Sequence, residues 1–428
     1  MADLDSLQSY LGSKVAFYVA FLVVLCAWQC VIAVPAVIFT VLQLVYGLQM
    51  RMVLWNVILV AMWAAAYTKS WANKSRELSA LWQGAEVDEA DKSRPEYIGE
   101  RRWVRGLADP ARGGKRADVL CELVKINPVT FTLQPMYPGW RRRLKMCASV
   151  AFIVVTLAAC GAVQYFFVIH VFDYGDNNQA NPANANYDAW YRIEYKVAGG
   201  AVTGLIIPVL NKLYQHCALS LTKWENHRRE MKHNDALVVK FFLVESFNSY
   251  FTLFYLGFVK QNLYHLSIQL GSVITTRFLV DQLVEYGVPI FLQRAKMGRR
   301  RRKAASQHTA SRRQGVLSDE EASFEQSTLP QIQDLYLEYA EMCIQYGYLV
   351  MFAPVFPVCF LIAALNNVIE IRGDLMKILY LGRRPVPRAA KDIGVWYFFL
   401  RLFTITGCFT NAGIITIGVN TWKLQAQP

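Results

Sequence analysis

Residues 338–374 read EYAEMCIQYGYLVMFAPVFPVCFLIAALNNVIEIRGD, and this stretch decides the fold. Two apolar runs flank the segment APVFP at 353–357, whose prolines do not continue a helix, so the stretch predicts a helical hairpin. Each outer end of the hairpin carries two carboxylates spaced three or four residues apart, which places each pair on one helix face. The pairs are Glu338 with Glu341 and Glu370 with Asp374.

The hairpin belongs to a chain rich in long apolar runs. Hydrophobic residues make up 54% of the 428 positions and gather into runs long enough to cross a bilayer. We therefore predict an all-α, polytopic membrane protein with about nine transmembrane helices. A separate membrane-embedded or interfacial helix, up to about Cys30, is expected before the first span. The predicted spans are about 31–47, 53–70, 147–172, 197–217, 236–259 and 266–293, the two arms of the hairpin, and 393–417.

Loop charges predict the orientation. The net charge is +13, and the basic loops alternate with loops poor in Lys and Arg, such as 173–191, which has none. Because cytosolic loops concentrate Lys and Arg, we expect a cytosolic N-terminus in either the plasma membrane or an internal membrane. This reading accounts for the basic charge without a nucleic-acid partner. The expected parts are a short cytosolic N-terminus at 1–14, a transmembrane domain at 15–417 with cytosolic loops at 68–146 and 294–330, and a tail at 418–428.

Three carboxylate pairs, including Asp281 with Glu285 on the sixth span, lie inside these spans. A lone ionised carboxylate in a bilayer costs at least ~2.5–3.5 kcal/mol, and the spans offer no matching set of Lys or Arg. Glu341 and Glu370 each lie about 14 residues from the turn, or ~21 Å, and the sixth-span pair lies near the cytosolic end of its span. All three pairs are therefore expected at one depth. A hard divalent cation with oxygen ligands is the natural counter-charge, which predicts calcium.

Other functional signatures are missing from the sequence. It contains no GxxxxGK phosphate loop, no GxSxG elbow and no HExxH helix, so nothing positive supports an enzyme. The nine cysteines include no CxxC pair, which argues against zinc and against a disulfide framework. We therefore expect that the protein is not an enzyme.

Several long segments resemble the anoctamin family. LTKWENHRREMKHNDALVVKFFLVESFNSYFTLFYLGFVK at 221–260 is similar to the family's fifth span, and the hairpin stretch resembles its seventh and eighth. VEYGVP at 284–289, RRPVPRAAKDIGVWY at 383–397 and YLGSKVAFYVAF at 10–21 resemble the family as well. The resemblance implies a calcium-activated transport protein that works as an anion channel, a phospholipid scramblase or both, usually as a homodimer with one conduction groove per subunit.

The same resemblance implies a set of ligands and a pathway. The implied calcium ligands are Asp281, Glu285, Glu338, Glu341, Asn366, Glu370 and Asp374, which would hold two calcium ions per chain. Polar residues on spans four to six would line a groove for chloride, other anions or lipid headgroups, although interhelical hydrogen bonding explains them equally well. These residues are Asn211, Lys212, Lys240, Glu245, Asn248, Gln269 and Arg277.

Two segments of the family have no counterpart in the sequence. We identify neither the large cytosolic domain before the first span nor the tenth span, which builds much of the family's dimer interface, and expect either a truncated sequence or a reduced member of the family. These departures weaken the expectation of a homodimer. They also favour an alternative, a non-conducting membrane tether or regulatory subunit with a calcium-sensing site. The intact set of six carboxylates favours transport.

Overall fold

A computed structural model shows the helices that the apolar runs predict, and confirms an all-α membrane fold. It describes residues 2–47, 49–82, 94, 96–108, 116–122, 124–126, 133–168, 189–283, 287, 335–385 and 387–425. The chain divides into two units. The first comprises Met1–Val87, Val163–Val209 and Asn248–Pro428, and the second comprises Asp88–Ala162 and Leu210–Phe247.

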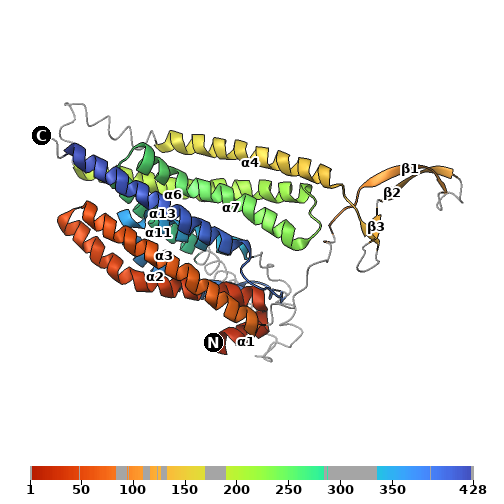
Figure 1. Ribbon diagram of the computed structural model, residues 1–428, viewed down its shortest axis with the longest axis horizontal. Helices are drawn as coiled ribbons and strands as arrows, with labels where there is room; N and C mark the ends of the chain where they lie inside the picture. The colour runs from red at the N-terminus through yellow and green to blue at the C-terminus, as the bar shows by residue number, and fades with distance from the viewer. Residues whose placement is uncertain are drawn as a thin grey trace, which may run out of the picture. The chain divides into compact units, whose positions relative to one another are not determined.

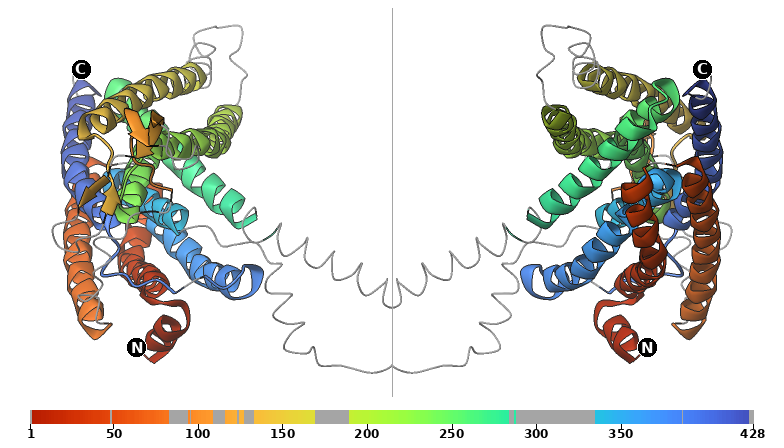
Figure 2. Two further views of the ribbon diagram at one scale, coloured as in Figure 1. Left: turned by 90° about the vertical axis from the view of Figure 1, so that its right-hand side faces the viewer. Right: turned by 90° about the vertical axis from the view of Figure 1, so that its left-hand side faces the viewer.

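The first unit is a packed set of helices (Figure 1). Within it, α2 lies beside α3 and α12, and α11 packs along α13 (Figure 2). The elements that lie wholly inside this unit are α1 (Ala2–Leu11), α2 (Ser13–Tyr46), α3 (Met50–Leu81), the π-helix η6 (Tyr255–Val259), α8 (Leu263–Gln282), α11 (Tyr336–Phe352), the 3-10 helix η8 (Ala353–Val355), α12 (Cys359–Met376), the π-helix η9 (Lys377–Leu381) and α13 (Val395–Gln425).

The predicted hairpin is confirmed in α11, η8 and α12. Pro354 lies in the first turn of η8, where its missing N–H leaves no hydrogen bond unmade. The backbone N–H of Phe356 donates to Ala353 O at 3.0 Å and closes the turn. From Tyr339 to Phe352, most side chains of α11 are buried. The hairpin therefore holds α11 in the protein interior and brings the outer ends of α11 and α12 to one region.

The first apolar run forms one helix, which corrects the prediction of a separate helix that ends near Cys30. Helix α2 continues from Ser13 to Tyr46 and contains Pro35. A proline removes one backbone donor, and a helix embedded among other helices can tolerate that loss. The helix break lies earlier, at Gly12, between α1 and α2. Its φ of 88° favours glycine, and a Cβ at this position would lie 2.9 Å from the backbone nitrogen of Arg388.

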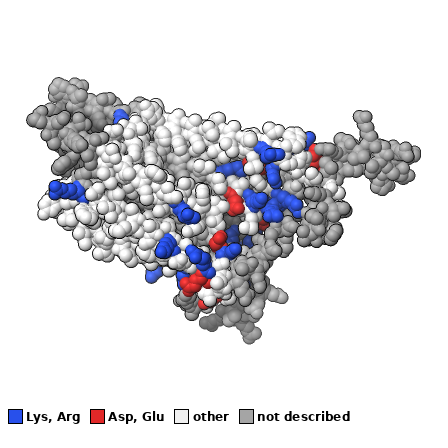
Figure 3. Space-filling model, in the orientation of Figure 1, with Lys and Arg blue, Asp and Glu red and all other residues white. Residues whose placement is uncertain are grey.

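Among the described residues, five helices are long and apolar enough to cross a membrane. They are Ser13–Tyr46, Arg51–Leu81, Gly139–Phe166, Glu230–Val259 and Val395–Gly418. Helices α11 and α12 coincide with two further predicted spans, but α11 has 17 residues and α12 carries Glu370, Arg372 and Asp374. Helix α11 is therefore too short, and α12 too charged, to be identified as a span by length and hydropathy alone. Much of the surface in Figure 3 is free of charged side chains, as expected for a membrane protein.

The second unit contains strands that the sequence did not predict. Within the predicted loop 68–146, β1 (Arg101–Ala108) pairs with β2 (Arg116–Glu122), and β3 (Val124–Ile126) pairs with β4 (Leu133–Pro135). Both pairs are antiparallel, with Arg101 opposite Glu122 and Val124 opposite Pro135. The unit also holds parts of three long helices, α4 (Gly139–Val168), α6 (Ala189–Trp224) and α7 (Glu230–Phe254). The strands are small additions to a helical fold.

Gly347 on α11 permits a close approach that another residue would prevent. A Cβ at this position would lie 2.7 Å from Tyr250 Cζ, and the Tyr250 hydroxyl donates to Ile344 O at 2.9 Å. We expect Gly347→Ala to lower the free energy of unfolding by about 1–3 kcal/mol, because it displaces this buried tyrosine. Thermal unfolding in detergent measures the loss. Gly139→Ala is the matched control, since nothing lies within 4 Å of its Cβ, and an equal effect of both changes would contradict the packing argument.

Candidate metal centre

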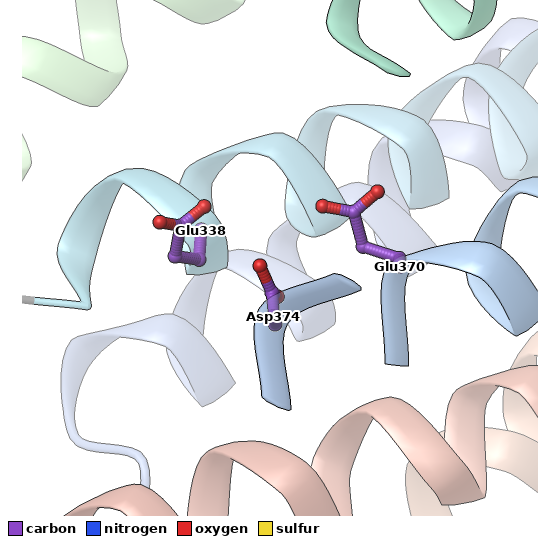
Figure 4. Close-up of side chains that lie close together, drawn as sticks. All are labelled: Glu338, Glu370 and Asp374. Atoms are coloured by element: carbon purple, nitrogen blue, oxygen red, sulfur yellow. The ribbon is translucent and has the colours of Figure 1, made fainter. Parts of the chain in front are cut away.

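Three carboxylates from two helices come together in the first unit (Figure 4). Glu338 lies in the first turn of α11, and Glu370 and Asp374 lie one turn apart on α12. One oxygen from each carboxylate lies within 4.8 Å of the others. Glu370 and Asp374 are each 2% exposed, whereas Glu338 is partly exposed. The hairpin has thus brought together three of the carboxylates that the sequence singled out.

This cluster has the donor chemistry of a calcium site. Carboxylate oxygens are preferred ligands of calcium, and side chains on packed helices can supply several of them at once. Carboxylates held this close also repel one another unless positive charge or hydrogen-bond donors face them. The residues present therefore fit a hard divalent cation.

Lys377 and Tyr18 supply donors to two of these carboxylates. The Lys377 ammonium lies 2.7 Å from Glu338 Oε1 and 3.9 Å from Asp374 Oδ1. The Tyr18 hydroxyl, from α2, donates to Asp374 Oδ2. The two oxygens of Asp374 thus face different partners, one cationic and one neutral.

Gln282, at the end of α8, supplies the donor to the third carboxylate. Its Nε2 donates to Glu370 Oε2 at 2.9 Å and to Asn366 Oδ1 at 3.1 Å. Asn366 is 5% exposed and lies one turn before Glu370 on α12. The amide therefore connects α8 to the predicted ligands on α12.

Sequence reasoning missed Tyr18, Gln282 and Lys377. Gln282 directly follows Asp281, and Lys377 follows Asp374 by three residues, so spacing could have suggested both. Tyr18 lies 356 positions from Asp374 in the sequence. No local pattern identifies such a partner, and only the packing of α2 against α12 reveals it.

Glu341 lines a small cavity between α8, α11 and α12. The cavity has a volume of about 40 Å³, and its polar lining comes from Arg277, Glu341, Gln345 and Asn366. A water needs roughly 10–15 Å³ of such space, so there is room for an ion or a few waters. Glu341 is not one of the three clustered carboxylates, but it shares this cavity with Asn366.

The remaining pair of predicted ligands lies on the sixth span. Asp281 belongs to α8, but its side chain is outside the described residues, and so is the whole of Glu285. Their participation stays a prediction. Gln282, the residue next to Asp281, reaches Glu370.

Lys240, one of the predicted groove residues, forms a buried ion pair in the second unit. Its ammonium lies 2.7 Å from Glu225 Oε2, which His227 Nε2 also approaches at 2.8 Å. The side chain of Glu225 is 1% exposed and that of Lys240 is 9% exposed. Burial alone would raise the pKa of Glu225, but the hydrogen bonds from His227 and Lys240 outweigh it and lower the pKa to about 2. The positive charge of Lys240 is therefore compensated inside the protein.

Three other predicted groove residues lie in the same unit. Asn211 Nδ2 donates to Glu245 Oε1 at 3.4 Å, and both residues are buried. Lys212, the neighbour of Asn211 on α6, is exposed. The two buried residues join α6 to α7, which is what the hydrogen-bonding alternative expects.

The last three predicted groove residues lie in the first unit. Asn248 is fully buried and accepts a hydrogen bond from Gln164 Nε2 at 3.2 Å. Gln269 is also fully buried. Arg277 is partly buried, and its Nη1 donates to Ser249 Oγ at 3.5 Å. The assignment of these residues to a groove stays a prediction.

Comparisons with known proteins agree with the resemblance seen in the sequence. A family model described as "Anoctamin: Calcium-activated chloride channel" matches residues 7–428. The chain is 27% identical to human anoctamin-10 over 297 residues, which cover 68% of this chain and 43% of that protein. It is 25% identical to human anoctamin-7 over 83% of this chain and 38% of that protein. It is 26% identical to human anoctamin-3 over 84% of this chain and 36% of that protein. The chain thus spans about two fifths of the length of these relatives.

Proposed function

The chain belongs to the anoctamin family, and from this premise we propose that it is a calcium-activated transport protein of the membrane. Its activity would be that of a passive chloride channel, a phospholipid scramblase, or both. The family membership and the apolar helices establish an integral membrane protein of a channel and scramblase family. The whole relatives are longer than this chain, so its own activity is a proposal.

The observation that carries the proposal is the meeting of Glu338, Glu370 and Asp374. Calcium, when bound, would supply positive charge among these carboxylates. The full proposed ligand set adds Asp281, Glu285, Glu341 and Asn366, and holds two calcium ions per chain. A cytosolic N-terminus and a homodimer with one groove per subunit belong to the same proposal.

The contacts around the carboxylates suggest how charge compensation controls the packing of helices. Glu338 belongs to α11, Glu370 to α12, and Gln282 connects the latter to α8. A gain of positive charge reduces the repulsion between the carboxylates and favours closer packing of these three helices. Such a change in packing, from one discrete arrangement to another, is how a local electrostatic event produces a larger response.

The proposed pathway lies along spans four to six. Lys212, which is exposed, brings positive charge that favours anions, whereas the charge of Lys240 is compensated by Glu225. Buried amides such as those of Asn248 and Gln269 offer polar contacts to a headgroup or an ion. The complete proposed lining is Asn211, Lys212, Lys240, Glu245, Asn248, Gln269 and Arg277.

Reconstitution into liposomes tests this function. We expect calcium to accelerate the transfer of labelled phospholipids between leaflets, the efflux of chloride, or both, because each requires the calcium-bound arrangement. Liposomes with magnesium in place of calcium and liposomes without protein are the controls. Identical rates of both processes with and without calcium would contradict the proposal and favour a non-conducting tether or regulatory subunit.

A further inference from the structure

We infer that Lys377 is a built-in counter-cation of the carboxylate cluster and sets the calcium concentration at which the cluster binds the ion. The inference rests on the proposed function, because it concerns the same carboxylates. The Lys377 ammonium has to leave Glu338 before calcium can bind to that carboxylate. Calcium affinity then includes the cost of opening an ion pair within the chain.

The position of the ammonium is the first argument. Lys377 Nζ lies 2.7 Å from Glu338 Oε1 and 3.9 Å from Asp374 Oδ1, so one cation faces two of the three clustered carboxylates. These two residues belong to different helices, α11 and α12. A bound divalent cation would be repelled by an ammonium so close to its ligands. Lysine and calcium therefore compete for the same oxygens.

The local backbone explains why this side chain reaches the cluster. Lys377 is the first residue of the π-helix η9, which continues α12, and its N–H donates to Asp374 O and Gly373 O. It follows Asp374 by three residues, which places the two side chains on one face of the helix. Single π-turns of this kind occur often at functional sites.

Two further donors that the structure describes at the cluster, Tyr18 and Gln282, are neutral. The Tyr18 hydroxyl donates a hydrogen bond to Asp374, and the Gln282 amide donates one to Glu370. These dipoles satisfy individual oxygens, but they do not cancel the net negative charge. Lys377 brings a full positive charge, and its side chain is 31% exposed, so the flexible stem can carry the ammonium to solvent. Because the Lys377 side chain is partly exposed, calcium can displace its ammonium from the cluster, whereas a fully buried lysine would remain paired with the carboxylates.

Calcium titration of the purified protein in detergent tests the inference, with thermal stability as the readout. We expect Lys377→Met to bind calcium about ten- to a hundredfold more tightly than wild type, the factor that corresponds to losing one charge-assisted hydrogen bond. The same variant should be less stable than wild type without calcium, because the carboxylates lose their counter-charge. Lys377→Arg keeps the charge and should titrate near wild type. Lys74→Met removes a partly exposed lysine that pairs with Glu77 on α3, and controls for net charge.

The outcomes separate this inference from the proposed function. If calcium stabilises none of the variants or the wild type, the calcium site itself is wrong. If calcium stabilises wild type but Lys377→Met binds it equally or more weakly, the counter-cation role is overturned and Lys377 is a structural residue. Lys377→Gln, which keeps a neutral donor at nearly the same length, serves if the methionine variant does not fold, and the same gain in affinity is required of it.

Discussion

Calcium-dependent stabilisation of the protein should almost disappear when Glu370 is replaced by Gln. Glu370 is 2% exposed and lies in the three-carboxylate cluster, so the change removes one charged ligand from the proposed site. We expect at least about a hundredfold weaker calcium binding, because the number of charged ligands tunes calcium affinity over several decades. At a calcium concentration of 100 times the wild-type Kd, the stabilisation would fall from about 2.7 to about 0.4 kcal/mol.

Thermal unfolding in detergent across a calcium series measures this effect. Glu77→Gln is the matched control, because Glu77 is an exposed acid on α3 whose partner is Lys74. The control should titrate like wild type. Equal calcium-induced shifts in Glu370→Gln and wild type would remove Glu370 from the ligand set and leave the cluster without its proposed role.

The helices and most of this cluster could be predicted from the sequence, because their signals are local. Apolar runs indicate the spans, and prolines at 354 and 357 indicate the turn. Equal distances from the turn place Glu341 at the depth of Glu370, whereas the structure clusters Glu338 with Glu370 and Asp374. The family resemblance adds Asn366, which Gln282 connects to Glu370.

The partners of the carboxylates could not be predicted in the same way. Tyr18 reaches Asp374 only because α2 packs on α12, and that packing depends on many side chains that have no simple pattern. Lys377 was overlooked for another reason, although its spacing of three residues from Asp374 is visible in the sequence. A lysine at the end of a span reads as a topological charge, and its contact with Glu338 depends on the tertiary position of α11.

Lys240 shows the same limit for the proposed groove. A lysine inside an apolar span suggests contact with an anion, but its ammonium lies against Glu225, which is 15 residues earlier and outside the span. The acid could be seen in the sequence at the end of α6, but the turn between α6 and α7 brings it to the lysine. A single lysine inside an apolar span is therefore weaker evidence for an ion-binding site than several paired carboxylates.

That ion pair makes the second large effect predictable. Replacing Lys240 by Met should lower the free energy of unfolding by about 3–5 kcal/mol at neutral pH, because Glu225 would be left buried without the ammonium that faces it. The side chain of Glu225 is 1% exposed, so solvent cannot take the place of the ammonium. Lys232→Met is the matched control, since Lys232 is exposed on the same helix, and it should have little effect.

The pH dependence of this loss distinguishes an unpaired charge from lost packing. In wild type the pKa of Glu225 is lowered from 4.5 to about 2, so its contribution to stability is complete above pH 4.5 and disappears as the pH falls through about 2. Without Lys240 the carboxylate is less favoured, and its pKa rises. The difference between Lys240→Met and wild type should therefore be largest at neutral pH and shrink toward pH 4. In addition, Glu225→Gln in the same chain should restore much of the stability, because a neutral amide needs no counter-charge. A loss that is independent of pH and not rescued by Glu225→Gln would show that Lys240 contributes through packing alone.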